Sequence, residues 1–183
     1  KNVHVIEAAD RLLARVASPQ ISAFFDALHR DHGVQPHTGT TLAAIDSVDD
    51  AFTGVRFADG STLTADLLLV GIGVQPDMRL AEAAGLACGN GILVGADMQT
   101  SHPGIYAIGD VALADETAPQ INATPIRVES VHNAQDSAAR AAAALTDTAP
   151  PARQALWFWS EQFDACLESA GIVPAAGNGV QQA

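Results

Sequence analysis

The chain has 183 residues, of which 48% are hydrophobic, and its formal net charge of −12 comes from 21 acidic side chains against 9 lysines and arginines. This acidity would repel a phosphate backbone, so we expect no nucleic-acid partner. No apolar run approaches the roughly 20 residues that cross a bilayer, and the first residues lack the order of a signal peptide, so we expect no membrane association and a cytoplasmic location.

The first elements predicted are a strand and a helix. Residues 3–6 form a short apolar run, which we expect to be a buried strand that ends at Glu7. Ser18 and Pro19 are a typical N-cap and first-turn pair, and they open a helix that Gly33 closes. The chain therefore begins with a β-then-α unit.

A hairpin and a central strand are predicted next. Residues 41–48 and 53–66 alternate like antiparallel strands, with a tight turn at Asp59–Gly60. Residues 67–73, LLLVGIG, are apolar on both faces, which favours a central strand covered by other layers on both sides. A short helix is expected over residues 78–86.

Residues 100–110 read TSHPGIYAIGD. The run from Ile105 to Ile108 predicts a buried strand that is entered through Pro–Gly. Gly109 would let the backbone approach another group closely, and the carboxylate of Asp110 follows directly. An acid at the end of a buried strand needs a partner, which indicates a binding site.

The rest of the chain predicts one long helix and a compact aromatic segment. The alanine-rich stretch from Glu129 to Leu145 favours a helix that packs closely through small residues. Residues 146–151 are typical of a linker, and an aromatic segment follows. We expect the final residues, 174–183, to be frayed.

The two cysteines indicate no local metal or redox site. Cys88 and Cys166 lie far apart, and neither belongs to a Cys-x-x-Cys motif. We expect two buried thiols and no metal ligands.

Three features together favour nucleotide binding. Glu7 stands at a strand end, where dinucleotide-binding folds place an acid that binds the adenosine ribose, although a solvated glutamate is the alternative. Gly71, Ile72 and Gly73 bare the backbone at the carboxyl end of the predicted central strand, where open α/β sheets bind ligands. The third feature is Asp110.

The order of five motifs resembles a known family. Glu7 at a strand end is followed by GIGVQP, TSHPGIYAIGD, RVESVHNA and LWFWSEQF. This series resembles the ferredoxin reductase branch of the FAD- and NAD(P)-dependent pyridine nucleotide oxidoreductases, the relatives of putidaredoxin and rhodocoxin reductases. The resemblance covers nearly all of residues 3–172. It implies FAD and NADH as cofactors.

The resemblance also implies roles for residues around the flavin. Gly109 and Asp110 would meet the ribityl chain or the adjacent pyrophosphate, and Val128 would meet the flavin through its main chain. Glu129 would lie toward the nicotinamide. His132 stands where relatives often carry Gln or Pro, so we expect it to bond locally.

Two further roles follow from the same resemblance. Trp157 or Trp159 would lie beside the isoalloxazine, and ordinary core aromatics are the equal alternative. Glu7 favours NADH over NADPH, because a carboxylate would repel a 2′-phosphate.

The implied fold class is α/β, a partial flavoprotein with two dinucleotide-binding domains and the start of an α+β interface domain. We expect residues 1–76 to be the latter half of an NAD-binding domain and residues 77–150 a returning segment of the FAD-binding domain. Residues 151–173 would start the interface domain. Because no glycine-rich turn precedes Val3, we expect a fragment that is inactive and colourless alone.

The implied activity is hydride transfer from NADH to FAD, followed by transfer of single electrons to a ferredoxin-type iron–sulfur protein. Relatives that reduce disulfides carry a dithiol, which this sequence lacks. The alternatives are an NADH-dependent nitrite or rubredoxin reductase relative and a non-catalytic interaction protein similar to apoptosis-inducing factor. The sequence does not identify the electron acceptor.

Overall fold

A computed structural model describes residues 1–114, 127–152 and 154–171 of the chain. The chain divides into two compact units, with residues 1–72 in the first and residues 73–171 in the second. The segment expected to be frayed, 174–183, lies outside the described residues.

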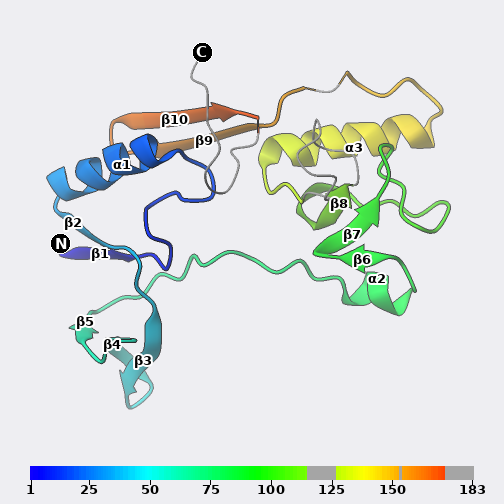
Figure 1. The fold of residues 1–183 in the computed structure, drawn as a ribbon. Helices are drawn as coiled ribbons and strands as arrows, with labels where there is room; N and C mark the ends of the chain where they lie inside the picture. Colours follow the sequence, from blue (N-terminus) through cyan, green and yellow to red (C-terminus); the bar gives the residue numbers. More distant parts are fainter. Residues whose placement is uncertain (115–126, 153, 172–183) are drawn as a thin grey trace. The chain divides into compact units, whose positions relative to one another are not determined.

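The first unit begins with a β-α-β arrangement (Figure 1). Strand β1 (Val3–Ile6) pairs in parallel with β2 (Val34–His37), and helix α1 (Pro19–Asp31) connects them and packs against β2. The side chain of Ser18 accepts a hydrogen bond from the main-chain nitrogen of Ile21, which caps the helix. The predicted helix is therefore confirmed at its start and within two residues of its end.

Strand β1 is less buried than its apolar run predicts. Val3 is exposed, and the other three residues are half-buried, so the prediction of a buried strand is wrong. The pairing with β2 brings His4 and His37 together, with Nδ1 and Nε2 2.9 Å apart and the two rings stacked. One face of the two-stranded sheet thus carries polar rings instead of aliphatic side chains.

An antiparallel sheet completes the first unit. It contains β3 (Leu42–Val48), β4 (Ala51–Phe57) and β5 (Thr62–Thr64) in that order. The predicted turn joins β4 to β5, and the carboxylate of Asp59 accepts a hydrogen bond from the main-chain nitrogen of Ser61. The turn between β3 and β4 uses Asp49 and Asp50, both with positive φ, which the hairpin requires.

The predicted central strand at residues 67–73 does not form. The segment has no strand pairing in the described chain, and Leu69 and Ile72 are each 92% exposed. An apolar sequence predicts burial, but a strand exists only where neighbouring strands accept its hydrogen bonds. Because the described residues provide no such neighbour here, this prediction is wrong for the structure.

The second unit contains a three-stranded sheet covered by a long helix (Figure 1). Helix α2 (Arg79–Ala83) precedes β6 (Cys88–Gly89), which is antiparallel to β7 (Gly91–Val94), and β7 is parallel to β8 (Ala112–Ala114). Helix α3 (Val131–Leu145) packs on this sheet through small side chains, as predicted. The buried cluster consists of Val94, Met98, Ala107, Ala112, Ala114 and Ala141.

A hairpin ends the described chain. Strand β9 (Trp157–Gln162) pairs in an antiparallel manner with β10 (Ala165–Ala170), so the predicted compact aromatic segment is a two-stranded sheet. Both cysteines are free, with Cys88 half-buried and Cys166 exposed on β10. The expectation of two buried thiols is wrong, because neither side chain is covered by a core.

Candidate functional site

The TSHPGIYAIGD segment is a hydrogen-bonded loop instead of a strand. The main-chain nitrogen and the hydroxyl of Thr100 both donate to the carbonyl of Ile105, at 2.9 and 3.0 Å. Gly104 has a φ of +81°, a conformation that favours glycine. Only Tyr106 forms a bridge, to Gln99, so the predicted buried strand at 105–108 is wrong.

Gly109 and Asp110 begin a short 3-10 turn, η1 (Gly109–Val111), that packs against α3. Gly109 has a φ of +70°, and its main-chain nitrogen donates to the hydroxyl of Ser137, at 2.9 Å. That hydroxyl donates in turn to the carbonyl of Asn133, at 2.7 Å. Glycine is needed here for its conformation, because the nearest atom to a Cβ would be at an ordinary distance of 3.9 Å.

Asp110 is held by its main chain and leaves its carboxylate exposed. Its carbonyl accepts a hydrogen bond from Nη1 of Arg127, at 3.0 Å. Among the described residues its carboxylate has no hydrogen bond or ion pair. The acid is therefore positioned and remains available to a hydroxyl group from outside the described chain.

Residues 127–132 lead into α3 beside this turn. Nη1 of Arg127 also forms an ion pair with Oε1 of Glu129, at 2.6 Å. The carbonyl of Val128 accepts a hydrogen bond from Nδ2 of Asn133, at 2.9 Å. His132 is half-buried in the first turn of α3. The fold thus brings together the Gly109–Asp110 turn and the Val128–Glu129 pair, which lie far apart in sequence.

Glu7, in the first unit, follows β1 and closes a local turn. Its main-chain nitrogen donates to the carbonyl of His37, at 2.9 Å, which extends the pairing of β1 with β2. Oε1 of Glu7 accepts a hydrogen bond from the main-chain nitrogen of Ala9, at 2.8 Å. One carboxylate oxygen therefore orients the side chain, and the second has no partner within the described part of the chain.

Gly71, Ile72 and Gly73 lie at the boundary between the two units, and all three are exposed. A Cβ at either glycine would meet no atom within 4 Å, and Gly73 has a φ of +96°. The backbone is therefore bare, as the sequence indicates, although no strand leads into it.

Trp157 and Trp159 lie on one face of β9 and stack on each other. Their ring centroids are 5.3 Å apart with an angle of 29° between the planes. They are 39% and 43% exposed, so the alternative of ordinary core aromatics does not describe them. Their contact with a flavin stays a prediction.

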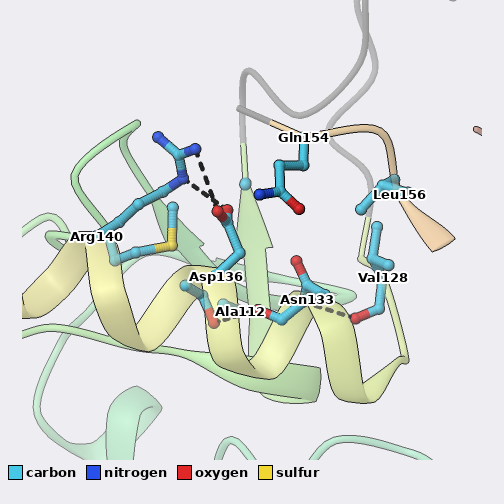
Figure 2. A pocket seen from close by; sticks show the side chains of 10 residues that line it. Ala112, Val128, Asn133, Asp136, Arg140, Gln154 and Leu156 are labelled. Atoms are coloured by element: carbon cyan, nitrogen blue, oxygen red, sulfur yellow. Dashed lines mark hydrogen bonds and ion pairs between the residues drawn. The ribbon is translucent and has the colours of Figure 1, made fainter. Parts of the chain in front are cut away.

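A small cavity is lined by residues of α3 and by Val128, Gln154 and Leu156 (Figure 2). Figure 2 shows Asp136 and Arg140 projecting from α3 at one end of the cavity, with Val128 and Leu156 at the other. Its volume is about 50 Å³, whereas ligand pockets typically hold about 300–1,000 Å³. The cavity is too small for a flavin, and its lining includes Val128 and the Ser137 that supports Gly109.

The described residues form no metal-binding cluster and no membrane-spanning helix. No group of three or more His, Cys, Asp and Glu side chains could hold a metal ion in the described ranges. No helix among the same residues is long and apolar enough to cross a bilayer.

Sequence reasoning missed two residues that organise this site. Ser137 is only 3% exposed and joins the Gly109 turn to α3. A lone serine in an alanine-rich helical face was the available signal, because a buried hydroxyl needs partners. Arg127 belongs to the RVESVHNA motif, but no pattern in the sequence shows which groups its guanidinium contacts.

Comparisons with known proteins agree on one family. The sequence pattern of the family described as pyridine nucleotide-disulphide oxidoreductase matches residues 1–138. The chain is 42% identical over 176 residues to the 5,5'-dehydrodivanillate O-demethylase ferredoxin reductase subunit of Sphingobium sp., covering 96% of this chain and 42% of that protein. It is 41% identical over 175 residues to putidaredoxin reductase of Pseudomonas putida, covering 93% of this chain and 41% of that protein.

A solved structure supports the same assignment. The crystal structure of the covalent putidaredoxin reductase–putidaredoxin complex matches with a TM-score of 0.87 and 40% identity, over 93% of this chain and 41% of that one. The chain thus spans about two-fifths of the length of the relatives that it matches. The predicted α/β flavoprotein-type fold and the predicted resemblance are confirmed. The chain belongs to the pyridine nucleotide-disulphide oxidoreductase family.

Proposed function

We propose that the protein carrying this chain is a flavoprotein reductase that moves hydride from NADH to FAD and then single electrons to a ferredoxin-type iron–sulfur protein. One observation carries this proposal: a Gly109–Asp110 turn, fixed on α3 with its carboxylate exposed, occurs in a chain about 40% identical to ferredoxin and putidaredoxin reductases. When bound, FAD supplies the chemistry, because it takes up electrons in pairs and releases them singly.

The described residues fit the sugar and ribityl parts of these cofactors. The exposed carboxylate of Asp110 can accept hydrogen bonds from flavin hydroxyl groups, and its fixed main chain reduces the entropy that ordering would cost. The second carboxylate oxygen of Glu7 can accept from an adenosine ribose hydroxyl. The same negative charge would repel the 2′-phosphate of NADPH, so we propose NADH as the donor.

Other residues would shape the surroundings of the flavin ring. We propose that Val128 meets the flavin through its main chain, whose carbonyl accepts one hydrogen bond from Asn133. Glu129 would place a negative charge toward the nicotinamide, and the exposed Trp157–Trp159 pair offers a flat apolar face that can shield the ring from water. The bare backbone at Gly71–Gly73 would lie against NADH. We place this reaction in the cytoplasm.

The test uses the native protein that carries this chain, purified and supplied with FAD. Its absorbance spectrum measures bound flavin, and NADH oxidation is followed with a [2Fe–2S] ferredoxin, a rubredoxin or nitrite as the acceptor. We expect stoichiometric flavin and fastest turnover with the ferredoxin. Faster turnover with rubredoxin or nitrite would identify that molecule, and not ferredoxin, as the electron acceptor. Bound flavin without NADH oxidation would favour a non-catalytic interaction protein.

A further inference from the structure

Arg127 connects the two acidic segments of the candidate site. Its Nη1 atom donates to the carbonyl of Asp110, at 3.0 Å, and pairs with Oε1 of Glu129, at 2.6 Å. One nitrogen thus contacts a residue 17 positions before it and another two positions after it. The Arg127 side chain is only 9% exposed, whereas its hydrogen bond to Asp110 lies at an exposed position and the Glu129 side chain is 26% exposed.

The sheet beneath this side chain leaves room for it. A Cβ on Gly91, at the start of β7, would lie 3.0 Å from Cδ of Arg127 and 2.8 Å from the carbonyl oxygen of Val111. Both distances are shorter than an ordinary contact, so a larger residue at position 91 would displace the arginine stem or the backbone next to Asp110. Glycine at position 91 therefore leaves the space that the Arg127 side chain occupies beside Asp110.

Stability alone does not explain a buried guanidinium at this position. Nε of Arg127 is buried and has no acceptor among the described residues. Burying an unpaired donor costs free energy, and replacing a buried ion pair by apolar side chains is often neutral or stabilising. An arginine that carries this cost and contacts both acidic segments points to a role in positioning them.

We propose that Arg127 is a positioning residue of the FAD site. It holds the main chain of Asp110 so that the exposed carboxylate keeps one orientation, and it fixes the carboxylate of Glu129 beside α3. This inference rests on the proposed function, because it assumes that Asp110 meets FAD. It goes beyond that function by assigning the orientation of both acids to one buried cation.

The test compares two buried arginines in the native protein that carries this chain. Arg127→Met removes the guanidinium and keeps an unbranched apolar stem. Arg140→Met is the matched control, because Arg140 is 7% exposed in the same unit and pairs with Asp136, at 2.6 Å, without contacting Asp110 or Glu129. The readouts are the FAD dissociation constant, the visible circular dichroism of bound FAD and the melting temperature of the flavin-free protein.

We expect Arg127→Met to raise the FAD dissociation constant about tenfold, the loss of roughly one hydrogen bond to a correctly placed acid. The dichroism of the bound FAD should change, and Arg140→Met should leave both flavin readouts within about twofold at a similar loss of melting temperature. Combining Arg127→Met with Asp110→Ala should raise the FAD dissociation constant little beyond Asp110→Ala alone, because both changes act on the contact between the Asp110 carboxylate and FAD.

Three results would overturn the inference. Equal effects of the two variants on FAD binding would make Arg127 structural, and so would full additivity with Asp110→Ala. If Arg127→Met does not fold, Arg127→Lys against Arg140→Lys gives the same comparison, since lysine keeps the charge but not the fork of donors. A wild-type protein that binds no FAD would overturn the proposed function as well, which distinguishes the two failures.

Discussion

The two acids that indicate nucleotide binding are held in opposite ways. Glu7, in the first unit, uses a carboxylate oxygen to accept the main-chain nitrogen of Ala9, so its side chain is part of a turn. Asp110, in the second unit, is held by its carbonyl and by the neighbouring Gly109 nitrogen, so its carboxylate takes no part in the fold. Both residues are acids, but within the described chain Glu7 leaves one carboxylate oxygen for a ligand, whereas Asp110 leaves both.

This difference indicates what each acid can contribute. A carboxylate that already accepts a main-chain hydrogen bond is oriented and has less capacity for ligand hydroxyls. A carboxylate with no described partner keeps its full capacity, and its position depends on the backbone beneath it. Binding energy should therefore depend more strongly on Asp110, whereas Glu7 should act mainly through its charge.

The largest effect is expected at Asp110. In the native protein, Asp110→Ala should raise the dissociation constant for FAD by about tenfold to a hundredfold, since hydrogen bonds to a charged group contribute roughly 1.5–3 kcal/mol each. Flavin content after dialysis and fluorescence titration measure this change. Asp97→Ala is the control, because Asp97 is an exposed acid of the same unit whose carboxylate accepts a hydrogen bond from the nitrogen of Gln99. Equal FAD affinity in wild type and Asp110→Ala would remove Asp110 from the site.

The second effect tests the support beneath Asp110. Ser137→Ala removes the buried acceptor of the Gly109 nitrogen, so the free energy of unfolding should fall by about 1–3 kcal/mol. Urea denaturation measures it. Ser101→Ala is the matched control, because the Ser101 hydroxyl accepts from the nitrogen of Ala87 at an exposed position where water can replace it. Similar losses in both variants would show that burial of Ser137 is not the cause.

A smaller effect is expected from the charge of Glu7. Glu7→Gln keeps an oxygen for the Ala9 nitrogen and removes the negative charge, so the turn should persist. We expect the Michaelis constant for NADH to rise a few-fold and the NADH-over-NADPH ratio of kcat/KM to fall. Glu82→Gln, on α2, controls for a general loss of charge. An unchanged NADH-over-NADPH ratio of kcat/KM would show that Glu7 is a solvated surface residue and does not select the cofactor.

The smallest effect concerns Asp59, whose carboxylate accepts a main-chain nitrogen two residues on, as that of Glu7 does. The hydroxyl and the main-chain nitrogen of Ser61 lower the pKa of Asp59 below its ordinary 3.8. Its stabilising contribution is therefore present above the unfolded pKa and is lost as the pH falls through the lower folded pKa. Urea denaturation of wild type and Asp59→Asn from pH 6 to about pH 2 should show a small difference that disappears at the acid end. A constant difference would contradict this assignment.

Local patterns predicted the elements whose stabilising contacts lie within a few residues. The Ser18–Pro19 start of α1, the Asp59–Gly60 turn and the small-residue face of α3 all form as predicted. Each of these depends on a cap, a turn or a periodic face, which neighbouring residues supply. The order of the motifs also identified the family, because it needs no knowledge of which atoms touch.

Only the tertiary structure decided which groups of the motifs are engaged. Residues 67–73 are apolar and still form no strand, because strand formation depends on partners elsewhere in space. The contacts from Arg127 to Asp110 and from Ser137 to Gly109 join segments 17 and 28 residues apart. Such contacts follow from the packing of α3 beside the η1 turn, and a one-dimensional pattern does not encode them because the hydrogen-bond partners are set by three-dimensional proximity.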